Sequence, residues 1–173
     1  MSVAQSRRFL VFGLLLALIV LVADQASKNW ALYGLGFINC PACLPIEVTP
    51  FFNLTMVWNE GISYGLFPAD SANEKYLLIG FSILMALILT WWLVRADGRW
   101  LAAGLGLVIG GAIGNVIDRF LYGAVVDFFH FHGFGYSWYV FNVADAAIVL
   151  GVGAILVDAV FMGRAAGGTE AKG

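Results

Sequence analysis

The sequence predicts an all-α membrane protein: four transmembrane helices, with a small β-element on the outer side of the bilayer between the first two helices. Two observations lead to this fold class. Of the 173 residues, 61% are hydrophobic and only 12% are charged, and the mean hydropathy is +0.88, which is outside the balance of an ordinary soluble domain. In addition, four apolar segments each have about the 20 residues that a helix needs to cross a bilayer. We therefore expect a single integral membrane domain over residues 1–173.

The four predicted spans lie near residues 9–28, 76–95, 100–118 and 140–162. The first follows two arginines, so a cleavable secretory signal is the alternative interpretation of that segment. A poor match to a cleavage site at Val22–Ala26 and the presence of three further spans favour a retained helix. The third span is rich in glycine, and small residues let helices pack closely in lipid.

Basic residues predict the orientation of the four spans. With a cytoplasmic N-terminus, six of the nine Lys and Arg residues lie inside: Arg7, Arg8, Arg95, Arg99, Arg164 and Lys172. Because Lys and Arg favour the cytoplasmic side of a membrane, we expect both termini in the cytoplasm. The segments from about 29 to 75 and from about 119 to 139 then lie on the outer side.

The two outer segments differ in composition. The first should form the β-element, at about residues 36–70, with strands at 46–49 and 51–58 that are rich in β-branched and aromatic residues. A turn is expected at Asn59–Gly61. The second, at 128–139, is dense in aromatic residues of the kind that settle at headgroup level. We interpret it as an interfacial anchor and entry region.

Neither the cysteines nor the histidines indicate a metal site. Cys40 and Cys43 give two possible ligands where zinc needs four, so a local disulfide in an oxidising outer compartment is the simpler interpretation. His130 and His132 lack a third ligand nearby and are expected to be interfacial histidines. We expect neither a metal nor another cofactor.

Polar residues gather at one level of the predicted bilayer, at the outer ends of the spans. Helical spacing places three groups of them each on a single helix face: Asn115, Asp118 and Arg119; Asn142 and Asp145; and Asp24 and Lys28. Such faces should turn inward, because an unpaired charge facing acyl chains is costly.

Two aspartates remain after the simplest charge pairing. Neighbouring residues can form two ion pairs, which are Asp24–Lys28 and Asp118–Arg119. Asp127 and Asp145 then have no cation, and an unpaired carboxylate at this depth indicates a functional site. Two carboxyl groups held close together cannot both ionise easily. Such a pair can take a proton from water and return one to a leaving amine, so an aspartic hydrolase is the leading enzyme class.

Other functions fit less well. A small proton-coupled transporter would also keep carboxylates within four spans, but transporters place their coupling sites near the bilayer midplane. A structural membrane subunit would explain the glycines and not the polar cluster. The sequence contains no G-x-S-x-G motif for a serine hydrolase. The net charge of −2 gives no reason to expect a nucleic-acid partner.

The polar residues occur in an order that resembles the signal peptidase II family, the bacterial lipoprotein signal peptidases. Five blocks carry the resemblance: Asp24-Gln25-x-x-Lys28, Asn59-x-Gly61-x-Ser63-Tyr64-Gly65, Gly110-Gly111-Ala112-x-Gly114-Asn115-x-x-Asp118-Arg119, Val125-Val126-Asp127-Phe128 and Phe141-Asn142-x-Ala144-Asp145. The resemblance implies a multi-pass aspartic endopeptidase of the bacterial inner membrane. Such an enzyme removes the signal peptide from prolipoproteins, cutting just before the diacylglyceryl-modified cysteine.

The resemblance also implies roles for individual residues. The catalytic pair would be Asp127 and Asp145. The supporting or substrate-binding residues would be Asp24, Lys28, Asn59, Gly61, Asn115, Asp118, Arg119 and Asn142. The expected partners are prolipoprotein signal peptides with a lipidated cysteine and the membrane phospholipid.

Overall fold

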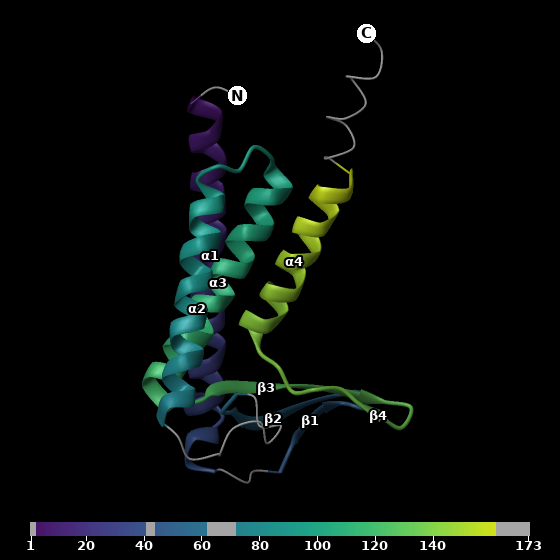
Figure 1. Cartoon of the computed structure of the whole chain (residues 1–173). Coiled ribbons are helices and arrows are strands. Elements are labelled where there is room, and N and C mark those ends of the chain that lie inside the picture. Colours follow the sequence, from purple (N-terminus) through teal and green to yellow (C-terminus); the bar gives the residue numbers. More distant parts are fainter. Residues whose placement is uncertain (1–2, 41–43, 62–71, 162–173) are drawn as a thin grey trace.

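The computed structural model describes residues 3–40, 44–61 and 72–161. Its long helices run side by side, and a small sheet lies across one end of the helix bundle (Figure 1). The helices are α1 (Val3–Asn29), α2 (Ala72–Leu93), α3 (Arg99–Tyr122) and α4 (Val143–Phe161). In the described part of the chain, four helices are long and apolar enough to cross a membrane. The prediction of four membrane-capable helices is thus confirmed.

Helix α3 packs between α1 and α4, and glycine makes both contacts possible. A Cβ atom added to Gly110 would lie 2.5 Å from the carbonyl oxygen of Ala17 in α1. A Cβ added to Gly111 would lie 2.5 Å from the carbonyl oxygen of Ala144 in α4. Because both obstacles are backbone atoms, only a residue without a side chain allows these helices to approach so closely.

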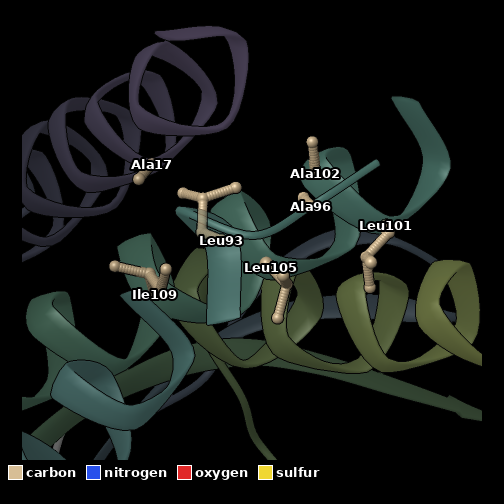
Figure 2. Close-up of a cluster of buried hydrophobic side chains, with 7 residues drawn as sticks. All are labelled: Ala17, Leu93, Ala96, Leu101, Ala102, Leu105 and Ile109. Atoms are coloured by element: carbon tan, nitrogen blue, oxygen red, sulfur yellow. The ribbon is translucent and has the colours of Figure 1, made fainter. Parts of the chain in front are cut away.

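A cluster of small and branched apolar side chains surrounds the α2–α3 connection (Figure 2). Its buried members are Ala17, Leu93, Ala96, Leu101, Ala102, Leu105 and Ile109. This connection lies at the end of the helix bundle away from the sheet (Figure 1). The polar residues of the five sequence blocks therefore lie outside this apolar cluster.

The sheet has four antiparallel strands in the order β1 (Ile46–Thr49), β2 (Phe52–Asn59), β3 (Val125–Gly133) and β4 (Tyr136–Ser137). The first two lie between α1 and α2 in the chain. The interpretation of residues 128–139 solely as an interfacial anchor was incomplete, because most of this segment belongs to β3 and β4. Aromatic residues favour strands as well as membrane interfaces, so composition alone did not separate the two.

Short helical turns connect α1 to the sheet. A π-helical turn at Trp30–Gly34 continues α1, and a 3₁₀ turn follows at Phe37–Asn39. Both contribute to a second apolar cluster with the sheet, whose buried members are Ala31, Leu32, Phe37, Leu54, Val126 and Phe128. This cluster fixes β3 against the end of α1. Cys40, just beyond it, is disulfide-bonded, while Cys43 and the predicted β-element residues 62–70 lie outside the described residues.

Candidate active site

The polar residues of the five blocks meet between the helix bundle and the sheet. Six of them are buried: Asp24, Lys28, Asn115, Asp118, Asp127 and Asn142. Asp145 and Arg119 are partly buried, while Asn59 is exposed at the end of β2. This group combines residues of α1, α3, the start of α4, β2 and β3, and it contains the carboxylates of Asp127 and Asp145.

Asp127 lies on β3 with only 1% of its surface exposed. Its Oδ1 accepts a hydrogen bond from Asn142 Nδ2 at 2.7 Å, and its Oδ2 accepts one from Asn59 Nδ2 at 2.9 Å. Burial, reinforced by the negative charge of Asp145, raises the pKa of Asp127 to about 7. Removal from water disfavours the charged form of a carboxyl group, and these hydrogen bonds offset only part of that effect.

Asp145 lies in the first turn of α4, where it forms a reciprocal cap with Asn142. The Asn142 N–H donates to Asp145 Oδ2 at 3.3 Å, and the Asp145 N–H donates to Asn142 Oδ1 at 2.8 Å. The Asn142 carbonyl accepts from the Ala146 N–H, so Asn142 is the N-cap of α4. This capping box explains why α4 begins at Val143 rather than at residue 140.

Asn142 therefore contacts both carboxylates at once. Its side-chain amide donates to Asp127, and its backbone N–H donates to Asp145. Asp145 also accepts a hydrogen bond at Oδ1 from Asn115 Nδ2 at 2.9 Å. Asp127 and Asp145, which had no cation in the simplest charge pairing, thus both accept hydrogen bonds from Asn142.

Lys28 is almost fully buried, with 2% of its surface exposed. Its ammonium group lies 2.8 Å from Asp24 Oδ2 and 2.7 Å from Asp118 Oδ2. It also donates to Asn115 Oδ1 at 3.0 Å. All three ammonium hydrogens thus have acceptors, as a buried cation requires.

The predicted pairing of Asp118 with Arg119 is wrong. Adjacent residues of a helix do not face each other, and Asp118 instead pairs with Lys28 from a different helix. Arg119 Nη1 donates to the carbonyl oxygen of Asn115 at 3.4 Å. Arg119 Nε is buried and has no hydrogen-bond partner among the described residues.

The carboxylates of Asp24 and Asp118 connect the helices to the two segments that carry the catalytic candidates. Asp24 Oδ1 accepts from the Ala144 N–H at 2.9 Å, next to Asp145 in the chain. Asp118 Oδ2 accepts from the Val126 N–H at 3.1 Å, next to Asp127. These two bonds hold the start of α4 and the start of β3 in fixed positions relative to α1 and α3.

Gln25 belongs to the site although it was not among the predicted site residues. Its Nε2 donates to Asp118 Oδ1 at 3.0 Å and to Asp24 Oδ2 at 3.2 Å. A third contact reaches the carbonyl oxygen of Gly114 at 3.3 Å. The signal in the sequence was a polar amide within an apolar span, directly beside Asp24.

A cavity of about 660 Å³ opens beside Asp127. Its polar lining residues are Asn59, Glu60, Asp127, His130, Ser137 and Tyr139. His130 Nε2 lies 2.7 Å from Ser137 Oγ, and the rings of His130 and His132 are 5.5 Å apart. Among the described residues, no three His, Cys, Asp or Glu side chains are grouped so that they could hold a metal ion.

Comparisons with known proteins place this arrangement in a family. Residues 16–161 match the model of the family described as signal peptidase (SPase) II. A protein of Methylobacterium sp. (strain 4-46) named lipoprotein signal peptidase is 48% identical over 154 residues, which cover 89% of this chain and 92% of that protein. One of the same name from Nitrobacter hamburgensis is 50% identical over 150 residues, covering 84% and 90%.

Solved structures agree with the sequence comparisons. A bacterial membrane enzyme determined by the in meso method at 1.9 Å resolution matches with a TM-score of 0.71 at 27% identity, covering 86% of this chain and 92% of that one. A second such enzyme, determined at 2.3 Å, matches with a TM-score of 0.67 at 28% identity, covering 84% and 85%. The chain belongs to the signal peptidase II family and is a bacterial membrane peptidase.

Proposed function

We propose that this peptidase is an aspartic endopeptidase that removes the signal peptide from diacylglyceryl-modified prolipoproteins, cutting just before the lipidated cysteine. The observation that carries the proposal is that Asp127 and Asp145 both accept hydrogen bonds from Asn142. The names of the relatives support prolipoproteins as the substrate class. Membership of a peptidase family does not favour the proton-coupled transporter considered from the sequence.

The two carboxyl groups share the proton transfers of peptide hydrolysis. Near neutral pH, the raised pKa of Asp127 keeps that carboxyl partly protonated. The ionised partner accepts a proton as water attacks the scissile carbonyl carbon, which gives a tetrahedral diol. The diol collapses as the C–N bond breaks and the leaving nitrogen is protonated. The products are a signal peptide with a free carboxyl group and a lipidated cysteine with a free amine.

Neighbouring polar groups position the pair and the substrate. The side-chain amides of Asn59, Asn115 and Asn142 each donate to one of the two carboxylates. Arg119 has a buried Nε without a partner among the described residues. We assign this N–H a role as donor to a backbone carbonyl of the substrate or to a phospholipid headgroup. The lipid on the cysteine holds the scissile bond at the interface and so lowers the entropic cost of reaching the pair.

The test is cleavage of a lipidated prolipoprotein by the purified protein in detergent or lipid. Mass spectrometry should find the free signal peptide and a mature chain that begins with the lipidated cysteine. The same precursor without its diacylglyceryl group is the matched control and is expected to be cleaved poorly. Absence of cleavage, or a cut at another bond, would contradict the proposed function.

The rate of this cleavage should depend on pH in a bell shape. It should fall as the pH rises through about 7, because Asp127 then loses the proton that the leaving nitrogen needs. The acidic limb reports protonation of the base, and both limbs belong to the pair. Between the ordinary pKa of 3.8 and about 7, the folded state holds this proton and the unfolded chain does not. The contribution of Asp127 to stability therefore decreases as pH rises through this range.

We infer that both termini are cytoplasmic and that the sheet lies on the outer face. The start of α1, the α2–α3 connection and the end of α4 lie at the end of the bundle away from the sheet, which supports this orientation (Figure 1). A cysteine at Phe134, whose side chain is fully exposed in the β3–β4 turn, should react with impermeant thiol reagents added to intact cells. A cysteine at Arg99, near the α2–α3 connection, is the matched control and should react only after permeabilisation. The opposite pattern would reverse the orientation.

A further inference from the structure

Three asparagine side chains donate to the two candidate catalytic carboxylates. The bonds are Asn59 Nδ2 to Asp127 Oδ2 at 2.9 Å, Asn142 Nδ2 to Asp127 Oδ1 at 2.7 Å and Asn115 Nδ2 to Asp145 Oδ1 at 2.9 Å. A carboxamide has a donor, its NH₂ group, and an acceptor, its oxygen. Rotating the amide by 180° exchanges the positions of the two. The hydrogen bonding of the pair therefore depends on what holds each amide in its orientation.

The oxygen of each amide accepts from a group that can only donate. These three donors are the Gly61 N–H to Asn59 at 3.1 Å, the Asp145 N–H to Asn142 at 2.8 Å and the Lys28 ammonium group to Asn115 at 3.0 Å. Asn115 Oδ1 also accepts a longer bond from Asn142 Nδ2, at 3.2 Å. Neither a backbone N–H nor an ammonium group has an acceptor to offer to a turned amide. Rotating any of the three amides by 180° would make its N–H groups face another donor.

We propose that Lys28 is a positioning residue of the reaction, whose ammonium group holds the Asn115 carboxamide with its N–H toward Asp145. This inference rests on the proposed function of Asp127 and Asp145. Held in this way, Asn115 donates to Asp145 through its N–H, so it stabilises the ionised form of that carboxyl and cannot accept a hydrogen bond from the neutral form. Lys28 makes the shorter, charged bond to Asn115 Oδ1, and substitution of its side chain can remove that bond.

The other charged groups around Asp127 and Asp145 determine which substitutions test the role of Lys28. Asp24 from α1 and Asp118 and Arg119 from α3 surround Lys28 and the pair, and Glu60 and His130 line the cavity beside Asp127. Lys28, Asp24 and Asp118 together carry a net charge of −1. Removing Lys28 alone would leave −2 in a buried site and would act through repulsion. Lys28→Met combined with Asp118→Asn removes the Lys28 donor and keeps the net charge at −1, and Asp118→Asn alone is the reference for the bonds that Asp118 itself makes.

In the combined variant, the charged bond to Asn115 Oδ1 is lost and the 3.2 Å bond from Asn142 Nδ2 remains. The Asn115 amide is then held less firmly and can turn to accept a hydrogen bond from neutral Asp145. The ionised form of the pair loses its advantage, so the acidic limb of the pH profile of kcat/KM should move to higher pH by about one unit. Lys28→Gln with Asp118→Asn should give the same shift, because a glutamine amide can donate or accept and does not fix its neighbour. This second variant decides the matter if the methionine variant does not fold.

Two controls distinguish an effect of Lys28 on the Asn115 amide from an effect of charge and from a general loss of structure. Asp118→Asn alone retains Lys28, so the acidic limb should show much less movement than in the combined variant. In an Asn115→Ala background, adding Lys28→Met and Asp118→Asn should produce no further shift, because the amide through which Lys28 acts is gone. All profiles are measured at matched levels of folded protein.

Either of two results would overturn the proposal. The acidic limb of the combined variants could coincide with that of Asp118→Asn, or the shift could persist in full without Asn115. Failure of the proposed function would look different. In that case the wild-type protein would not cleave a lipidated prolipoprotein, or an asparagine at position 127 or 145 would leave cleavage intact.

Discussion

Asp127→Asn and Asp145→Asn are each expected to abolish cleavage of a lipidated prolipoprotein while the protein still inserts and folds. Asparagine has almost the same size as aspartate, but it cannot take a proton from water. General acid–base catalysis contributes roughly 10²- to 10⁴-fold, so a loss near the upper end of that range is expected for each variant. Because the two groups act as a unit, the double variant should be scarcely worse than either single one.

The measurement is single-turnover cleavage at matched amounts of folded protein. Asp158→Asn is the matched control, since it makes the same change in α4 at the end away from the sheet. It should leave cleavage close to the wild-type rate. Substantial turnover by one of the two site variants would remove that aspartate from the pair. Turnover by both would refute the aspartic mechanism and leave the family assignment untouched.

The sequence predicted the membrane helices well because their signal is local. An apolar run of about 20 residues has few alternatives to a membrane span. Helical spacing also placed Asn115, Asp118 and Arg119 on α3 and joined Asn142 with Asp145 at the start of α4. The position of the Asp145 carboxyl group follows from the capping box at the start of α4. Two polar residues three positions apart in the sequence can indicate such a box.

Contacts between elements were harder to predict. Strand β3 was missed because Phe128, Phe129 and Phe131 obscure the alternation of polar and apolar residues, and its pairing with β2 depends on a partner about 70 positions away in the chain. The pairing of Lys28 with Asp118 joins two helices, so rules for neighbours within one helix could not supply it. Asp127 and Asp145 are brought together because β3 is hydrogen-bonded to Asp118 of α3 and α4 is hydrogen-bonded to Asp24 of α1.

Gly111→Val is expected to disrupt cleavage strongly although residue 111 touches neither carboxylate. An added Cβ would lie 2.5 Å from the carbonyl oxygen of Ala144 and 2.9 Å from Ile148 Cγ1. The first obstacle is the backbone of α4, so α4 must move away from α3. Asp145 directly follows Ala144, and that displacement would pull Asp145 from Asn115 and from the pair. A misplacement of about 1 Å can cost about 10²-fold in rate, and overpacking of this kind costs about 1–3 kcal/mol of stability.

Gly153→Val is the matched control, because it makes the same substitution in a helix where an added Cβ meets nothing within 4 Å. Both variants carry the same intrinsic cost of a β-branched residue in a helix, so only the approach of α3 to α4 distinguishes them. Cleavage and thermal unfolding in detergent should both be impaired by Gly111→Val and little changed by Gly153→Val. Equal effects of the two substitutions would show that α4 can shift without separating the aspartates, and that close packing at Gly111 does not position Asp145.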